Sequence, residues 1–222
     1  MKYGFIGCGN MGSAIARALS KVTTDIMICD RSGKANALAA ELGCTYASAQ
    51  QVAETCDRIF LAVKPQMMAT VLAPLSPTLS VRKPLLITMA AGLAMEQIET
   101  MAGASLPVIR IMPNTPVAVG NGVVLYCHNN QVTSDALQAF LDDMRFCGIL
   151  DPIEERLFDA AGTVSGCGPA YMYMFLEAMA DGAVACGVPR AKALEYAAAT
   201  MAGAAQMYLT THQHPGILKD AV

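Results

Sequence analysis

Three glycines near the amino terminus have a spacing that suits a phosphate-containing ligand. Residues 7–12 read G-C-G-N-M-G, the pattern G-x-G-x-x-G, directly after a short apolar segment. The first glycine permits a tight turn, the second lets the main chain approach a pyrophosphate, and the third lets a helix pack on the strand. Free N–H groups at the start of that helix attract the anion. We predict a dinucleotide-binding loop; the alternative is an ordinary tight turn between a strand and a helix.

The end of the next apolar segment carries two conflicting signals about which dinucleotide is bound. Asp30 lies 18 residues after Gly12, close to where an acidic residue binds the ribose 2′-OH of NAD. Arg31 and Ser32 follow directly, and both suit the 2′-phosphate of NADP. The alternative for Arg31 is a solvated loop charge. We predict NADPH as the cofactor, with NADH left open as a second option.

Alternating strands and helices are expected to position this loop. Apolar strands are predicted at residues 1–7, 25–30, 44–47, 59–63, 85–89 and 108–112, and helices at 11–20, 33–43, 48–55, 65–72 and 95–101. The apolar runs are continuous, which indicates βαβ units and a sheet covered on both faces. Residues 122–127 are expected to add an antiparallel edge strand.

Beyond residue 153 the strand signals fade. Helices are predicted at residues 154–164, 169–186, 190–209 and 216–222, and a domain boundary is predicted near Pro152. On the helix at 169–186, Glu177 and Asp181 share one narrow stripe, and the other faces are largely apolar. Two or three helices cannot bury so much apolar surface alone, so we predict a dimer formed by residues 153–222.

The composition excludes several classes of protein. The hydrophobic fraction is 54% and the charged fraction 15%, whereas soluble domains typically have about 45–50% and about 25%. Such a chain is not disordered. A net charge of −3 argues against a nucleic-acid partner. Proline, glycine and asparagine interrupt the uncharged stretches at 111–134 and 160–176, so no membrane span is expected.

The eight cysteines are scattered through apolar stretches and form no C-x-x-C pair. The amino terminus lacks the apolar region of a signal peptide. We therefore predict a reducing, cytoplasmic location. His212 and His214 lack a third ligand at a suitable spacing, and no metal is expected.

Four further motifs carry a family resemblance. Residues 61–66 read LAVKPQ, 110–116 read RIMPNTP, 165–171 read SGCGPAY and 214–220 read HPGILKD. With the glycine loop, and in this order, they resemble the pyrroline-5-carboxylate reductase family. The resemblance implies a Rossmann-type doubly wound α/β domain (residues 1–152) and an all-α dimerisation and substrate domain (residues 153–222). It also implies a homodimer, or a higher oligomer built on dimers.

The activity implied by the resemblance is the last step of proline biosynthesis. In that reaction the C=N bond of 1-pyrroline-5-carboxylate is reduced to give L-proline by hydride transfer from nicotinamide C4 of NAD(P)H. The cofactor carries the chemistry, and the protein aligns two planar partners.

Two groups of site residues are predicted. The cofactor-binding residues are expected to be Ile6, Gly7, Gly9, Asn10, Met11, Gly12, Arg31, Ser32, Ala62, Val63, Lys64, Pro65, Met112, Pro113 and Asn114. The resemblance implies that the last three lie near the nicotinamide. The substrate-binding residues are expected to be Ser165, Gly166, Cys167, Gly168 and Pro169.

A helix start is predicted within the second group. Gly168 as N-cap and Pro169 as first helical residue would leave free N–H groups facing the substrate carboxylate. The alternative is a plain interdomain glycine turn before a buried helix.

The sequence departs from the family pattern at two places. Cys167 stands where family members often have serine, so a hydroxyl group at this position is not essential. In the family, a Ser-Pro-Gly-Gly-x-Thr loop follows the Leu-Lys-Asp segment, closes on the substrate carboxylate and carries a threonine that helps to protonate the substrate. That threonine would lie beyond Val222, so no catalytic residue is assigned within residues 1–222.

Two other functions share parts of this sequence pattern. A β-hydroxyacid dehydrogenase would need a Lys-x-x-Asn element after its glycine motif, and the residues after Gly168 do not contain one. A sensor that binds NADPH and signals through its dimer would share the predicted fold. Turnover of pyrroline carboxylate discriminates the reductase from the sensor.

Overall fold

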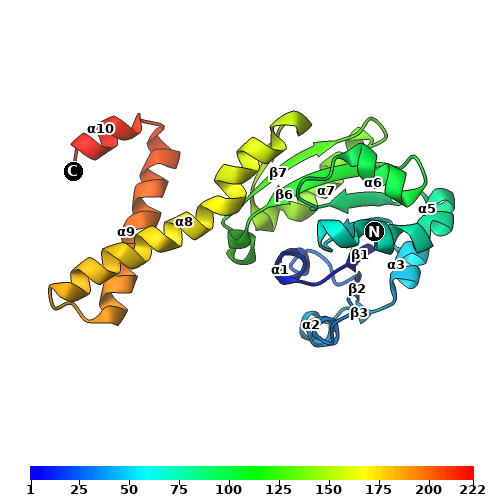
Figure 1. The fold of residues 1–222 in the computed structure, drawn as a ribbon, viewed down its shortest axis with the longest axis horizontal. Helices are drawn as coiled ribbons and strands as arrows, with labels where there is room; N and C mark the ends of the chain where they lie inside the picture. The colour runs from blue at the N-terminus through cyan, green and yellow to red at the C-terminus, as the bar shows by residue number, and fades with distance from the viewer. The chain divides into compact units, whose positions relative to one another are not determined.

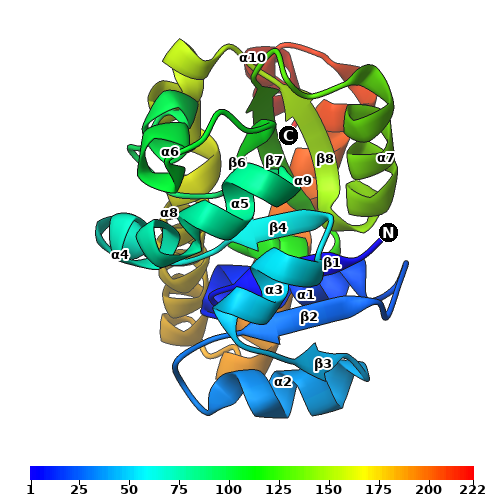
Figure 2. The ribbon, with the colours of Figure 1, turned by 90° about the vertical axis from the view of Figure 1, so that its right-hand side faces the viewer.

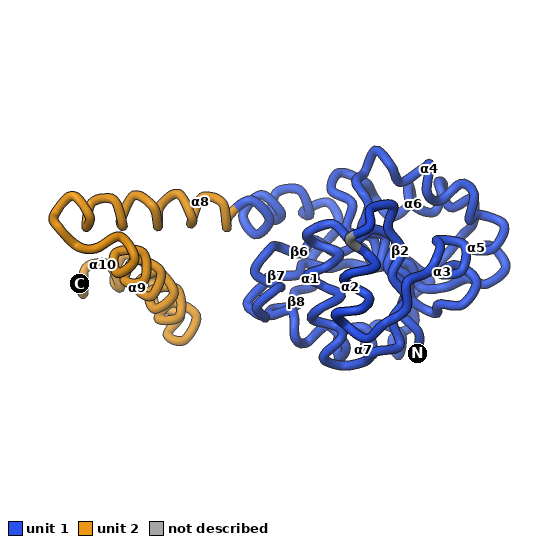
Figure 3. Tube along the Cα trace, turned by 90° about the horizontal axis from the view of Figure 1, so that it is seen from below, with its two compact units in different colours: residues 1–167 blue, residues 168–222 orange. Residues whose placement is uncertain are grey.

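The computed structural model describes residues 1–222, apart from the side chain of Lys34. It divides into two compact units, Met1–Cys167 and Gly168–Val222 (Figure 3). Unit 1 carries a sheet with helices, and unit 2 is helical. The domain boundary at residue 152 stays a prediction.

A mainly parallel sheet forms the centre of unit 1. Its strands are β1 (Tyr3–Ile6), β2 (Ile26–Cys29), β3 (Thr45–Tyr46), β4 (Arg58–Leu61), β5 (Leu85–Thr88), β6 (Val108–Pro113), β7 (Gly122–His128) and β8 (Gly148–Pro152). The order is β3-β2-β1-β4-β5-β6-β7-β8 (Figure 2). From β1 the chain adds β2 and β3 on one side and then β4 and the later strands on the other side, so the strand order reverses between β1 and β4. This is the doubly wound order, and the fold class predicted from the sequence is confirmed.

Helices cover both faces of this sheet (Figure 1). They are α1 (Asn10–Leu19), α2 (Lys34–Leu42), α3 (Ala49–Thr55), α4 (Met68–Leu72), α5 (Ser76–Arg82), α6 (Met95–Ala102) and α7 (Ser134–Met144). Side chains from α1, α2 and α7 join one hydrophobic core, and side chains from α3, α4, α5 and α6 join a second. Both faces of β1, β4 and β5 are therefore buried, which explains the continuous apolar runs in these segments.

Local sequence signals position several helix ends. Ser48 accepts a hydrogen bond from the Gln51 N–H in a reciprocal capping box and starts α3. Gly43 ends α2 in the left-handed conformation, at φ 65°. These contacts are made within a few residues, so a local pattern is enough to predict them.

The region beyond β6 differs from the expectation. β7 pairs antiparallel with β6, as predicted, but β8 pairs with β7 on its other side. The described edge strand is therefore β8, and the prediction of residues 122–127 as the edge is wrong. Residues 148–152 read G-I-L-D-P, in which only Ile149 and Leu150 form an apolar run, and two apolar residues between glycine and aspartate give no strand signal.

The helix start predicted at Gly168 and Pro169 is wrong. One helix, α8 (Phe158–Ala185), contains Pro169 in its interior. A proline in a helix removes one main-chain hydrogen bond and usually kinks or ends the helix. The remaining helices are α9 (Arg190–Thr211) and α10 (Pro215–Asp220).

Unit 2 exposes large apolar side chains. Tyr171, Met174, Phe175 and Tyr196 are each 58–66% exposed. None of the described helices is long and apolar enough to cross a membrane. Large exposed apolar side chains gathered in one part of a chain are typical of a protein–protein interface.

Candidate functional site

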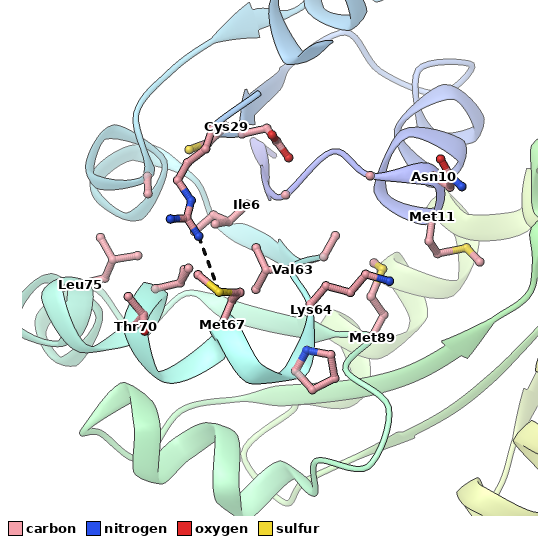
Figure 4. A pocket seen from close by; sticks show the side chains of 18 of the residues that line it. Ile6, Asn10, Met11, Cys29, Val63, Lys64, Met67, Thr70, Leu75 and Met89 are labelled. Atoms are coloured by element: carbon pink, nitrogen blue, oxygen red, sulfur yellow. Dashed lines mark hydrogen bonds between the residues drawn. The ribbon is translucent and has the colours of Figure 1, made fainter. Parts of the chain in front are cut away.

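A cavity of about 1020 Å³ opens at the carboxyl ends of the parallel strands (Figure 4). Ligands bind at this edge in open α/β sheets, where the strand order reverses. Most of the predicted cofactor-binding residues line it: Ile6, Gly7, Gly9, Asn10, Met11, Arg31, Ala62, Val63, Lys64, Pro65, Met112 and Pro113. The tertiary structure thus brings together four segments that are far apart in the sequence.

Asp30, the acidic residue at the position of a ribose ligand, also lines the cavity. The other lining residues were not predicted; they are Cys29, Ala49, Gln50, Met67, Thr70, Val71, Pro74, Leu75, Met89 and Ala91. Several belong to α3, α4 and the turns beside them, which pack next to β4. Their place in the wall depends on helix packing, and Met67 alone had a local signal, since it directly follows the K-P-Q motif.

The three loop glycines meet different surroundings. Gly7 has φ +102°, and a Cβ atom there would lie 2.6 Å from the Ala62 carbonyl oxygen. A Cβ atom on Gly12 would lie 2.5 Å from the Gly7 carbonyl oxygen. A Cβ atom on Gly9 would meet nothing within 4 Å. Gly7 and Gly12 therefore permit the tight packing, while Gly9 leaves main chain open to a ligand, as a pyrophosphate requires.

Asp30 is tied to the glycine loop. Its Oδ2 accepts a hydrogen bond from the Cys8 N–H at 2.7 Å, and its Oδ1 accepts one from the Ser32 N–H at 2.7 Å. Burial raises the pKa of Asp30, but the hydrogen bonds from Cys8 and Ser32 and the charge of Arg31 outweigh it, so the pKa is lowered overall. The ionised carboxylate therefore holds the loop through the main chain of Cys8.

Cys8 itself is protected. Burial raises the pKa of its thiol to about 12, and the neighbouring Asp30 charge adds to the shift. A thiol with so high a pKa stays protonated and unreactive.

Two cationic side chains stand at the cavity wall. Arg31 Nη2 lies 3.8 Å from the Met67 sulfur, and Lys64 follows β4 (Figure 4). Ser32 and Gly12 do not line the cavity. Together with the N-terminus of α1, Arg31 and Lys64 favour an anionic ligand. The open main chain at Gly9 and this charge fit the phosphate groups of a dinucleotide.

Asn114 does not line the cavity. Its side chain is buried, its Oδ1 accepts a hydrogen bond from the Val123 N–H at 2.9 Å, and its Nδ2 donates one to the Ser165 carbonyl oxygen at 2.9 Å. Its role as a cofactor-binding residue stays a prediction.

The predicted substrate residues Ser165, Gly166, Cys167, Gly168 and Pro169 are consecutive in α8. Their N–H groups do not begin a helix, so the predicted anion site at a helix N-terminus is wrong. Their contact with substrate through other atoms stays a prediction.

The histidines near the carboxyl terminus have a local role. His214 caps α10 by accepting a hydrogen bond from the Gly216 N–H at 3.1 Å. Among the described residues, no cluster of three or more His, Cys, Asp and Glu side chains is placed to hold a metal ion.

A doubly wound sheet with a glycine loop at its carboxyl edge, followed by helices, defines a dinucleotide-binding protein of the oxidoreductase type. Comparison with known proteins specifies it further. Residues 155–222 match the family described as "Pyrroline-5-carboxylate reductase dimerisation", and residues 2–92 match "NADP oxidoreductase coenzyme F420-dependent". The chain belongs to the pyrroline-5-carboxylate reductase family.

Relatives that match over essentially the whole of this chain support this assignment. The chain is 41% identical to pyrroline-5-carboxylate reductase of Escherichia coli (strain K12), over 100% of this chain and 84% of the relative. It is 35% identical to the Pisum sativum reductase, over 99% of this chain and 81% of the relative.

Solved structures agree. Plasmodium falciparum pyrroline carboxylate reductase with NADP bound matches with a TM-score of 0.90 and 34% identity, over 100% of this chain and 84% of that one. The Streptococcus pyogenes reductase matches with a TM-score of 0.91 and 34% identity, over 100% and 85%. A Mycobacterium tuberculosis 3-hydroxyisobutyrate dehydrogenase, 13% identical over 82% of this chain and 63% of that one with a TM-score of 0.61, shares the fold alone.

Proposed function

We propose that this protein reduces the C=N bond of 1-pyrroline-5-carboxylate to L-proline with NADPH. The observation that carries the proposal is the cavity at the carboxyl edge of the sheet, walled by the glycine loop and the strand-end motifs of the reductase family. When bound there, NADPH supplies the hydride for the imine carbon. The protein's own contribution is to bind and align the two reactants.

Main-chain and cationic groups would hold the cofactor. The open main chain at Gly9 and the N-terminus of α1 suit the pyrophosphate. Met112 and Pro113, at the end of β6, would lie towards the nicotinamide. Residues 62–65 would line the cofactor between these points.

Arg31 would distinguish NADPH from NADH. Its guanidinium group stands at the cavity wall and suits a 2′-phosphate. Each carboxylate oxygen of Asp30 accepts one main-chain hydrogen bond, so Asp30 holds the loop. The position of Arg31 supports NADPH over NADH.

The working unit would be a homodimer, or a higher oligomer built on dimers. The support is the exposed apolar surface of α8 and α9, which a second copy would cover. The eight cysteines are free, which fits a reducing cytoplasm. Light scattering at micromolar concentration tests the dimer, and a monomer would contradict it.

The activity is tested by mixing the full-length protein with pyrroline carboxylate and NADPH and following the loss of nicotinamide absorbance. We expect turnover, faster with NADPH than with NADH, and formation of proline. NADPH binding without turnover would overturn the proposal in favour of a dinucleotide sensor.

A further inference from the structure

The carboxyl end of β6 is tied to its neighbours by one buried amide. Asn114 is 7% exposed and directly follows β6, whose last residues Met112 and Pro113 line the cavity. As described above, its oxygen accepts the Val123 N–H of β7 and its nitrogen donates to the Ser165 carbonyl of α8. A single side chain therefore joins β6, β7 and α8 beside the cavity.

The Ser165 carbonyl lacks its usual donor within the helix. In a helix, the N–H of residue i+4 donates to the carbonyl of residue i. Four residues after Ser165 stands Pro169, which has no N–H. Asn114 Nδ2 replaces the missing donor, which explains how α8 continues through an interior proline.

A second contact lies on the same side of α8. A Cβ atom on Gly162 would lie 3.3 Å from the Met112 methyl carbon, so Met112 packs closely against α8 at this glycine. Asn114 and Met112 together fix the turn containing Gly162 and Ser165 against the end of β6.

We propose that Asn114 is a positioning residue for the reduction. It replaces the hydrogen bond that Pro169 removes and so fixes the Ser165 turn of α8 against the strand end that lines the cavity. The inference rests on the proposed function, because alignment of the imine with the nicotinamide is what this arrangement would control. Small misplacements at such a site reduce rates strongly.

A coupling experiment tests the link between Asn114 and Pro169. Asn114→Ala is expected to lower kcat/KM for pyrroline carboxylate about tenfold while the KM for NADPH changes less than about twofold. Pro169→Ala restores an N–H for the Ser165 carbonyl, so the loss caused by Asn114→Ala should shrink to about threefold in that background. In this double-mutant cycle, the two losses are compared within each background, so any effect of Pro169→Ala alone on kcat/KM cancels.

A pH profile of a second variant, Asn114→Asp, tests the Asn114 Nδ2 donor directly. This test can be made even if Asn114→Ala fails to fold. Asn114→Asp keeps an oxygen for the Val123 N–H but puts an oxygen opposite the Ser165 carbonyl. Protonation of this buried carboxyl would restore a donor. Its kcat/KM relative to the wild type should therefore rise as the pH falls.

Asn129 provides a matched control at the other end of β6. Its Oδ1 accepts the Val108 N–H at 3.1 Å, and its Nδ2 donates to the Leu106 carbonyl oxygen at 2.7 Å. Asn129→Asp should lower stability as Asn114→Asp does, while kcat/KM stays within about twofold of the wild type.

The outcomes separate the two proposals. Absence of turnover by the wild type overturns the proposed function and this inference together. If the wild type turns over, any one of three results overturns the inference alone. The first is an equal loss from Asn114→Ala in the wild-type and Pro169→Ala backgrounds. The others are a flat relative pH profile for Asn114→Asp and an equal loss of activity in Asn129→Asp.

Discussion

The two ends of the central sheet use polar side chains in opposite ways. At the amino ends of β1 and β4, Arg58, Tyr3 and Asp143 bond to one another. Arg58 is 2% exposed, and its Nη1 lies 3.0 Å from the Asp143 carboxylate. Burial, together with the hydrogen bond to Asp143, raises the pKa of Tyr3, so the phenol stays neutral.

At the carboxyl ends, polar groups face open space instead. Gly9 leaves main chain uncovered, and Arg31 and Lys64 stand at the cavity wall. The carboxylate of Asp30 accepts hydrogen bonds from main-chain N–H groups. The side chain of Asn114 bonds to the Val123 N–H and the Ser165 carbonyl oxygen.

The difference separates stability from binding. In the amino-end cluster, Tyr3, Asp143 and the Nη1 atom of Arg58 bond to one another, so the cluster holds the fold, although the buried Arg58 Nη2 has no hydrogen-bond partner. At the carboxyl end, the loops after parallel strands leave charged and main-chain groups available. Substitutions at the two ends should therefore affect different measurements.

The largest expected effect is on stability at the amino end. Asp143→Ala leaves the buried Arg58 guanidinium without a carboxylate, and the free energy of unfolding should fall by about 3–5 kcal/mol. Urea unfolding at fixed protein concentration measures this, and kcat/KM should not change. Asp142→Ala, at the exposed neighbouring position, should cost less than about 0.5 kcal/mol. Equal losses of unfolding free energy in the two variants would show that the bond of Asp143 to Arg58 does not stabilise the fold.

The next effect is on binding at the carboxyl end. Gly9→Val places a side chain where the pyrophosphate approaches, so the Kd for NADPH should rise about 100-fold, or ~2.7 kcal/mol. The melting temperature should hold, because a Cβ atom there meets nothing within 4 Å. Gly4→Val is the contrast, since its Cβ would clash with Val52 and lower stability. Unchanged NADPH affinity in Gly9→Val would place the cofactor elsewhere.

A smaller effect concerns the choice of cofactor. Arg31→Ala should raise the KM for NADPH about tenfold and leave the KM for NADH unchanged, because only NADPH carries the 2′-phosphate. Steady-state kinetics with both cofactors measure this. Arg17→Ala, which removes an exposed partner of Glu41, is the control. Equal increases for both cofactors would rule out 2′-phosphate recognition by Arg31.

The smallest effect is the pH dependence that Asp30 contributes. Its pKa is lower in the folded than in the unfolded protein, so its stabilisation is present above the unfolded value of about 3.9 and is lost as the pH falls towards the folded value. Melting temperatures measured from pH 6 to pH 3 should therefore fall less steeply in Asp30→Asn than in the wild type. Parallel curves would show that Asp30 makes no such contribution.

Local patterns were sufficient for some of this molecule. The glycine spacing at residues 7–12 predicted the loop, because each glycine acts on atoms within the same strand–turn–helix or directly beside it. The Ser48 cap and the Gly43 helix end likewise depend on contacts within a few residues. Pro169 misled the prediction, because a proline after glycine is a common helix start, and the donor that replaces its missing N–H is Asn114, 51 residues before the Ser165 carbonyl that it serves.

By itself, the sequence determined the doubly wound fold, the dinucleotide loop and the family, because these follow from periodicity and from motifs whose residues act close to one another. The tertiary structure decided the remaining arrangement. It bound Asp30 to the main chain of the loop, made residues of α3 and α4 part of the cavity wall, placed β8 at the edge, and continued α8 through Pro169. Each of these depends on contacts between segments distant in the sequence, and the energy of such contacts leaves no periodic pattern in either segment.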